Sequence, residues 1–397
     1  VGNNGTPSSI TSTSGAITIT GRGGNTGGDN DGVLIWQGEI RSATGDITLI
    51  GTGGTAGNGE GVNLYRSRVE STGTGSNAAN ILIQGTDGSE AYSVAHQAAG
   101  SGLSSLTSID GDIEIQGNTI NSTSLGTLIA GVISITGSGQ LTIDQAGVAD
   151  IAISSPTSMG VPSGGITLTA GRDISFNTGA SITATTGNVT LQADRSILLN
   201  PGSSITSSSG GITLAANTAG TASGNFSGIT LNNANLTTGS GAISLTGIGG
   251  NTGSINHGIS QVGNSVVATT TGNITYQGTS GVGTASDNDG IRTEGSGTAI
   301  RSQNGNILLT GVSRGNIGMF NDGVLIHLNS TVETTGSGSV TIDGSATGAG
   351  GTDRAIITTA GTTIRTGTGN ISLIGRDTPA GVTGLFLDNG TTVGTAT

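Results

Sequence analysis

A short phrase of alternating apolar and polar residues recurs along the whole chain. It places an apolar-polar-apolar triplet after a small or turn residue, and Gly or Ala often follows, as in ITITG from Ile17 and ITLTA from Ile166. Alternation with a period of two is typical of a half-buried β-strand. Thirteen copies begin at Ile17, Ile47, Ile81, Ile113, Ile133, Ile166, Val189, Ile212, Ile243, Ile274, Ile307, Val340 and Ile371. The pattern therefore indicates a repeat protein built from strands.

The spacing of the copies predicts how the repeats stack. Successive copies are 30, 34, 32, 20, 33, 23, 23, 31, 31, 33, 33 and 31 residues apart. Many repeats hold a second strand-like segment, such as Gly323–Ile326, and a third apolar element, such as Val332. Three strands per repeat form the cross-section of a parallel β-helix, in which each coil covers the inward side chains of its neighbours. We predict an all-β parallel β-helix of about 13 coils of 20–34 residues, three short strands per coil, as one continuous domain over residues 1–397.

Composition supports this fold and excludes several classes of protein. Gly accounts for 76 of 397 residues but shows no period of three, which excludes collagen, and only 9% of residues are charged, which argues against disorder. The absence of Cys excludes disulfides and thiolate metal sites. The net charge of −12 argues against a nucleic-acid partner. The sequence has no apolar run of the roughly 18 residues that a membrane helix needs, so we expect no membrane insertion.

The middle of the chain resembles a known family. The phrases GITLTAGRDI, GASITATTGNVTLQA and ILLNPGSSI within Gly165–Ala216 are similar to the repeats of filamentous-haemagglutinin-like exoproteins of bacteria and cyanobacteria. The resemblance implies a right-handed β-helical shaft that is exported through an outer-membrane partner. It also implies an extracellular or cell-surface location and roles in adhesion, aggregation or biofilm formation.

A carbohydrate-active enzyme is the alternative, because β-helices also carry lyases and glycosidases. Glycosidases need two carboxyl groups separated by roughly 5–10 Å, and Asp110, Asp112 and Glu114 are the candidates. A solvated turn explains these residues better, and His96, His257 and His327 occupy different repeat positions, as expected of surface histidines. We therefore expect a protein that is not an enzyme and has no catalytic residues.

Two acidic tetrapeptides are candidate calcium ligands. Asp29 and Asp31 belong to the sequence DNDG, and Asp287 and Asp289 belong to a second copy, each just before a predicted strand. Oxygen-rich loops of this kind can bind calcium. A turn is the competing interpretation, because Asn, Asp and Gly are also the residues that turns prefer. The protein has no evident requirement for a cofactor, and calcium is the one candidate.

These observations favour an extracellular structural or adhesive shaft. Open coil ends carry unpaired strand edges, so we expect the protein to associate with itself, end to end or laterally. Cell-surface or matrix polysaccharide is a second candidate partner, because Trp36, Tyr65, Tyr92 and Phe320 could stack on sugars. A groove lined by clustered carboxylates and aromatic rings would favour the carbohydrate-active alternative, whereas a uniform Thr/Ser/Asn surface would favour the shaft.

Overall fold

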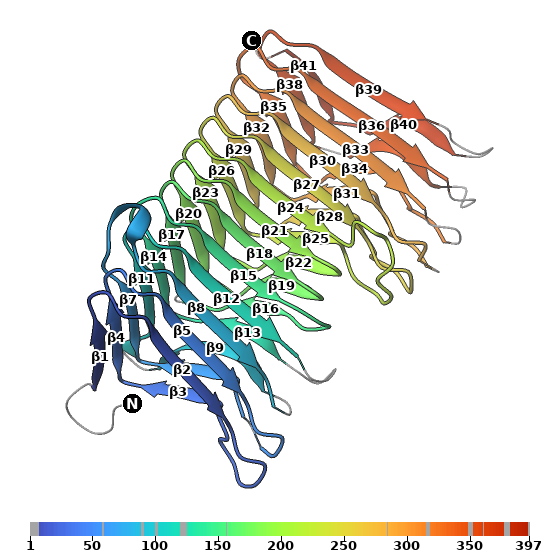
Figure 1. Ribbon diagram of the computed structural model, residues 1–397. Coiled ribbons are helices and arrows are strands. Elements are labelled where there is room, and N and C mark those ends of the chain that lie inside the picture. The colour runs from blue at the N-terminus through green and yellow to red at the C-terminus, as the bar shows by residue number, and fades with distance from the viewer. Residues whose placement is uncertain are drawn as a thin grey trace. The chain divides into compact units, whose positions relative to one another are not determined.

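The chain folds into two compact units, residues 1–190 (unit 1) and 191–397 (unit 2). The computed structural model describes residues 8–57, 59–88, 91–99, 102–119, 125–155, 157–283, 285–314, 318–347, 352–359, 361–376 and 382–395. Each unit contains three parallel β-sheets, which the chain visits in turn, once per coil (Figure 1). The predicted three-strand parallel β-helix is thus confirmed in each unit. One continuous domain over residues 1–397 stays a prediction.

Unit 1 contains most of the first half of the strands. Sheet 1 contains β1 (Ser9–Ser12), β4 (Glu39–Ser42), β7 (Arg68–Ser71), β11 (Ser105–Ser108), β14 (Val132–Ile135), β17 (Ser158–Val161) and β20 (Ser181–Ala184). Sheet 2 contains β2 (Ile17–Arg22), β5 (Ile47–Thr52), β8 (Ile81–Thr86), β12 (Ile113–Asn118), β15 (Leu141–Gln145) and β18 (Ile166–Ala170). Sheet 3 contains β3 (Val33–Trp36), β6 (Val62–Tyr65), β9 (Tyr92–Ala99), β13 (Gly126–Ile129), β16 (Ile151–Ile153) and β19 (Asp173–Phe176). A 3-10 turn, η1 (Gly75–Asn77), and β10 (Gly102–Leu103), antiparallel to β9, complete this unit.

Unit 2 repeats the arrangement. Its sheet 1 contains β23 (Ser204–Ser207), β26 (Asn235–Thr238), β29 (Val266–Thr269), β32 (Ala299–Ser302), β35 (Thr331–Thr334), β38 (Thr363–Thr366) and β41 (Thr392–Thr395). Its sheet 2 contains β24 (Ile212–Ala216), β27 (Ile243–Ile248), β30 (Ile274–Thr279), β33 (Ile307–Ser313), β36 (Val340–Ala346) and β39 (Ile371–Arg376). Its sheet 3 contains β22 (Ser196–Leu199), β25 (Ile229–Asn232), β28 (Ile259–Val262), β31 (Ile291–Glu294), β34 (Val324–His327), β37 (Arg354–Thr358) and β40 (Thr383–Leu387). The remaining strand, β21 (Val189–Ala193), contains the boundary between the units.

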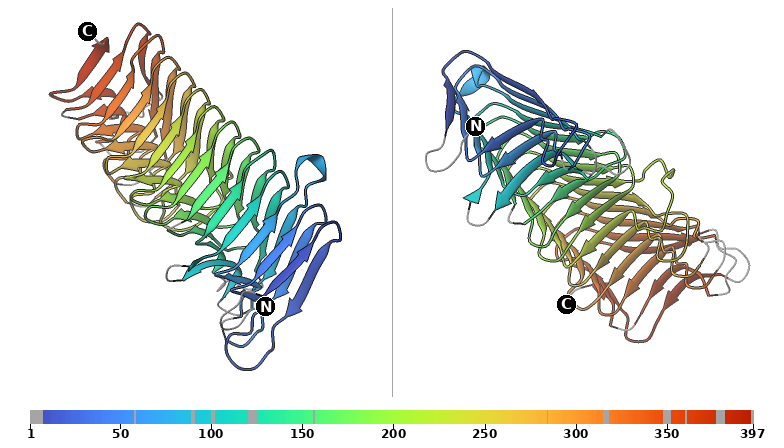
Figure 2. Two further views of the ribbon diagram at one scale, coloured as in Figure 1. Left: turned by 90° about the vertical axis from the view of Figure 1, so that its left-hand side faces the viewer. Right: turned by 90° about the horizontal axis from the view of Figure 1, so that it is seen from below.

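The alternating phrase becomes a strand with one buried and one outward row. In β5, Ile47 and Leu49 are fully buried, whereas the intervening Thr48 is partly exposed. These residues lie directly above their counterparts in the next coil, with Ile47 opposite Ile81 and Leu49 opposite Ile83. Fully burying one such side chain stabilises the fold by about 1.5–3 kcal/mol. Figure 2 shows the strands of each unit lying in successive rungs, so these rows form continuous apolar ladders.

One copy of the phrase lies in a different sheet from the other twelve. ISITG from Ile133 lies in β14 of sheet 1, and the sheet 2 strand of that coil begins at Leu141, which pairs with Ile113 on one side and Ile166 on the other. The spacings are therefore 28 (113 to 141) and 25 (141 to 166), not 20 and 33. The lower bound of 20 residues per coil was wrong. All three sheets alternate with the same period of two, so the alternation alone does not identify the sheet.

The described residues contain no helix that is long and apolar enough to cross a membrane.

Candidate binding groove

Both acidic tetrapeptides form the turn that leads into sheet 3. The first Asp of each has a left-handed backbone, with φ of 51° at Asp29 and 60° at Asp287. The final glycine is required by close packing, because a Cβ added to Gly290 would lie 2.4 Å from the backbone nitrogen of Val312. Asp, Asn and Gly are the residues that tolerate such positions best. The motif is thus explained by the turn itself.

The asparagine of the motif in unit 2 belongs to a buried ladder. The backbone N–H of Asn256 donates to Oδ1 of Asn288 at 3.0 Å, Asn288 donates likewise to Asn321 at 3.1 Å, and Asn321 to Asp353 at 2.9 Å. Side-chain amides extend the pattern, since Nδ2 of Asn288 donates to Oδ1 of Asn321. A buried amide N–H without an acceptor is costly, so the ladder stabilises successive turns.

A second column of polar side chains follows one position later. Oδ2 of the fully buried Asp289 lies 3.3 Å from Nδ1 of His257, and Oδ1 of Asp289 accepts the backbone N–H of Asp322 at 2.9 Å. Oδ1 of Asp322 in turn accepts the backbone N–H of Arg354 at 2.8 Å. Burial raises the pKa of Asp289 well above its usual range and that of Asp322 to about 7, and it lowers the pKa of His257 to about 3.

Unit 1 has a related pair of carboxyl groups at the same turn. Oδ1 of Asp31 accepts the backbone N–H of Glu60 at 3.0 Å, and its Oδ2 accepts Nδ2 of Asn63 at 3.1 Å. Burial, followed by a hydrogen bond with Asp31, raises the pKa of Glu60 to about 8. The nearby carboxylate of Asp31 adds to this shift, because a like charge opposes the ionisation of Glu60.

The described residues contain no group of three or more His, Cys, Asp or Glu side chains placed to bind a metal. Calcium binding by Asp29, Asp31, Asp287 and Asp289 therefore stays a prediction, and the turn explains these residues without a metal.

A groove of about 320 Å³ crosses the outer face of sheet 3 in unit 2. It is lined by Asp287, Arg292, Phe320, Asp322, Leu325, His327, Arg354, Ile357, Thr359, Phe386 and Asp388. The strands β31, β34, β37 and β40 place Arg292, Leu325, Ile357 and Phe386 in one outward row, each opposite the next. Carboxylates and aromatic rings are thus combined here, as the carbohydrate-active alternative requires.

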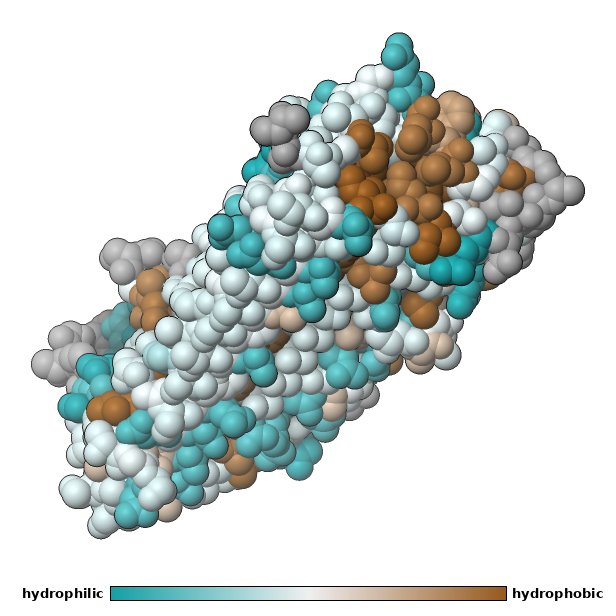
Figure 3. All heavy atoms as spheres, turned by 90° about the horizontal axis from the view of Figure 1, so that it is seen from above, coloured by the Kyte–Doolittle hydropathy of each residue, from teal (hydrophilic) through white to brown (hydrophobic). Residues whose placement is uncertain are grey.

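The floor of the groove is apolar although it faces outward. Leu325 and Ile357 are only 9% and 8% exposed, whereas Phe320 and Phe386 at the edges are 46% and 39% exposed. Two buried aliphatic side chains between two accessible rings form a surface for a ligand with an apolar side. Figure 3 shows that most of the face it draws is of intermediate hydropathy, with most of its hydrophobic residues gathered in one part.

The charged side chains of the groove are held by contacts within the protein. Nε of Arg292 donates to Oε2 of Glu294 at 2.9 Å. The guanidinium of Arg354 lies 4.7 Å from the ring centroid of Phe386, and its Nη1 donates to the carbonyl of Thr352 at 2.8 Å. These contacts fix the positions of both guanidinium groups before any ligand arrives.

The other side of the groove is polar and less charged. Oγ1 of Thr359 lies 2.7 Å from Nδ1 of His327, so the hydroxyl and the imidazole are joined by a hydrogen bond. Burial lowers the pKa of His327 below its usual value. Asp388 follows β40 and is exposed, which leaves its carboxylate in contact with solvent.

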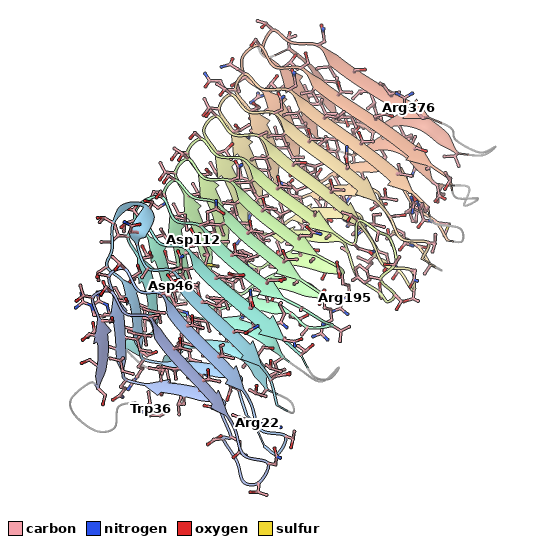
Figure 4. All side chains as sticks on the ribbon, in the orientation of Figure 1. Arg22, Trp36, Asp46, Asp112, Arg195 and Arg376 are labelled. Carbon is pink, nitrogen blue, oxygen red and sulfur yellow. The ribbon has the colours of Figure 1, made fainter. Side chains whose placement is uncertain are left out.

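The three acidic candidates for catalysis lie in a turn and on a strand of unit 1. The carboxylate of Asp110 accepts the backbone N–H groups of Gly75 and Ser138, and Oδ1 of Asp112 accepts that of Gln140 at 2.8 Å. Glu114, on β12, accepts the side-chain amide of Gln116. Figure 4 labels Asp112 and Asp46 at the corner where the chain enters sheet 2. These contacts agree with the turn interpretation.

The histidines differ from the expectation of surface positions. His96 is fully buried and lies opposite the inward Leu64, because β9 brings it into the core of unit 1, and this burial lowers its pKa to about 4. His257 is 2% exposed and lies beside the buried Asp289 in unit 2. Only His327 of the three lies at a groove.

Two of the predicted aromatic residues form an outward stack in unit 1. The rings of Trp36 and Tyr65 are 4.2 Å apart with an interplanar angle of 17°, and Trp36 is 39% exposed. Their register on β3 and β6 places one directly above the other. The stack is a flat aromatic surface. The pocket lined by the neighbouring Gln37 and Arg66 has one carboxylate, that of Glu39.

Sequence patterns missed most of the groove. Phe320 and Asp287 drew attention, but Arg292, Arg354 and Phe386 lie in different repeats and share no motif. Arg292 and Phe386 belong to one outward row of sheet 3, and Arg354 lies three residues before Ile357 of that row, so only the register of the coils brings the three together. Comparisons of the chain with family models, curated proteins and solved structures found no match.

Proposed function

We propose that this chain is part of an extracellular β-helical shaft with a structural and adhesive role. The observation that carries the proposal is the stacking of similar coils through apolar ladders within each unit, joined in unit 2 by the asparagine ladder. Such stacking gives stiffness in one direction and repeats the outer face from coil to coil. A shaft of this kind needs no catalytic centre.

Inward side chains of the last described coil would be covered by a further β-coil, whether that coil belongs to the same chain or to another. Leu385, Leu387 and Val393 occupy positions opposite the buried Ile356, Thr358 and Ile364, yet they are 40%, 46% and 39% exposed. A further coil would cover these side chains and pair the open strand edges. In the proposed shaft, this face is covered by another β-coil.

Electron microscopy of the purified protein tests the assembly. We expect filaments with a rung spacing of about 4.8 Å. The inward substitution Val393→Lys should abolish filaments, whereas Thr392→Lys on the outward side of the same strand should leave them intact. Discrete particles from the parent protein, or equal effects of the two substitutions, would contradict the proposal.

A sugar-binding module is the second candidate function. The groove on sheet 3 of unit 2 favours it, because carboxylates, guanidinium groups and aromatic rings gather there around an apolar floor.

A further inference from the structure

The groove in unit 2 has the amphipathic chemistry that suits a sugar. A pyranose ring presents C–H groups on its faces and hydroxyls along its edge. Leu325, Ile357 and the ring of Phe320 provide an apolar surface, and Asp287 and Asp388 provide hydrogen-bond acceptors. Asp287 precedes the first strand of the groove and Asp388 follows the last, so the acceptors lie toward opposite ends of the strands. We propose that this groove binds a short uncharged oligosaccharide.

The fold does not explain why a large aromatic side chain occupies position 320. The backbone of Phe320 is left-handed, with φ of 61°, as at the equivalent turn positions Asp287 and Ile255. The turn imposes this conformation, which costs a bulky side chain about 1 kcal/mol or more and is easier for Asn or Gly. The ring is nevertheless 46% exposed, so it makes little of the contact that would offset this cost. Stacking on a ligand accounts for an exposed ring at this place.

The charges of the groove favour an uncharged ligand. The guanidinium of Arg292 is already paired with Glu294, and that of Arg354 lies over Phe386. Burial of Asp322 raises its pKa to about 7, which makes this carboxyl a hydrogen-bond donor as well as an acceptor near neutral pH. A polyanion would meet Asp287 and Asp388, and both guanidinium groups are already held by contacts within the protein.

The size of the groove limits the ligand. Its volume of about 320 Å³ lies at the lower end of the range of roughly 300–1,000 Å³ that ligand pockets span. Its row of outward side chains extends over four neighbouring strands. A short segment of a longer glycan chain fits this shape.

The binding test uses the full chain and a panel of neutral saccharides: cellobiose, laminaribiose, maltose, mannobiose and lactose, with a heparin-derived oligosaccharide as the anionic comparison. Isothermal titration calorimetry measures affinity, and saturation-transfer NMR identifies the sugar protons in contact. We expect binding of at least one neutral sugar, with the strongest transfer to ring C–H protons. Phe320→Asn should weaken this binding about tenfold, since a stacked ring contributes on that scale.

The chain offers a matched control. Ile255→Asn changes an exposed apolar residue at the same left-handed turn position two coils away, outside the groove. Both substitutions place Asn at a positive φ, so both variants should unfold at or above the parent's midpoint, and only Phe320→Asn should lose affinity. Asp287→Asn should also weaken binding while preserving the turn.

Either of two results with the neutral sugars would overturn the site: no heat and no saturation transfer with any of them, or equal affinity in the Phe320→Asn and Ile255→Asn variants. Preferential binding of the heparin fragment would also overturn it. Val393→Lys, which tests assembly, leaves the groove residues unchanged, so a failure of the filament proposal is distinguishable from a failure of this one.

Discussion

Nδ1 of His257 lies 3.3 Å from Oδ2 of Asp289, and both side chains are buried. The same Nδ1 accepts the backbone N–H of Asp289 at 3.2 Å, so this nitrogen carries no proton. Burial favours the neutral forms, because it raises the pKa of Asp289 and lowers that of His257 to about 3. Burial therefore favours a protonated carboxyl group at Asp289 beside an unprotonated Nδ1 of His257.

This neutral pair predicts how substitutions at Asp289 behave. Asp289→Asn should lower the free energy of unfolding by less than about 1 kcal/mol, because the amide is neutral and its oxygen can still accept the backbone N–H of Asp322. Asp289→Ala should cost about 2–4 kcal/mol, because the buried N–H of Asp322 loses its acceptor. Denaturant titration measures both values. Nitrogen NMR should show an unprotonated Nδ1 in His257 down to about pH 4, and a midpoint near the ordinary histidine pKa would contradict the pair.

The asparagine ladder predicts a large effect from one amide. Asn288→Ala removes the acceptor of the buried Asn256 N–H and the side-chain bonds to Ala285 and Asn321. We expect a loss of about 2–3 kcal/mol in the free energy of unfolding. Asn251→Ala is the control, because Asn251 is exposed and accepts one N–H from Gly224, and it should cost at most about 1 kcal/mol. Similar losses at both positions would show that the ladder adds nothing beyond an ordinary turn bond.

The raised pKa of Glu60 predicts how the stability of unit 1 depends on pH. Its folded-state pKa of about 8 lies above the ordinary value of 4.5, so the unfolded chain releases this proton first as the pH rises. The stabilising contribution is complete below about pH 4.5 and is lost as the pH rises to about 8. Because the side chain is partly exposed, we expect a loss of only about 1–2 kcal/mol. Glu60→Gln should flatten the dependence of unfolding on pH over this window, and an unchanged profile would exclude Glu60 as its source.

The fold could be predicted because inward and outward residues alternate throughout. The same regularity caused the one misassignment: Ile133 and Leu141 both begin alternating strands, and only their pairing shows that Leu141 continues the row of Ile113. From Ile47 to Ile166 the coil length in unit 1 therefore falls steadily, from 34 to 32, 28 and 25 residues.

The groove was harder to predict because it is assembled across coils. Arg354 and Phe386 are 32 residues apart and belong to unlike phrases, yet β37 and β40 place their side chains in contact. The acidic motifs were conspicuous in the sequence, but the side chain of Asp289 is buried and Asp287 adopts the left-handed backbone of the turn. Burial and register, which decide these outcomes, depend on neighbouring coils and cannot be read from a single repeat.

The regular ladder also bears on how such a protein changes length. The ladder residues of unit 2 recur after 32, 33 and 32 residues, at Asn256, Asn288, Asn321 and Asp353. Each coil offers its neighbour the same backbone donor and receives the same side-chain acceptor. Duplication or loss of one complete coil in the gene would thus join matching surfaces, and the stack of coils could gain or lose a coil during evolution without a new kind of junction.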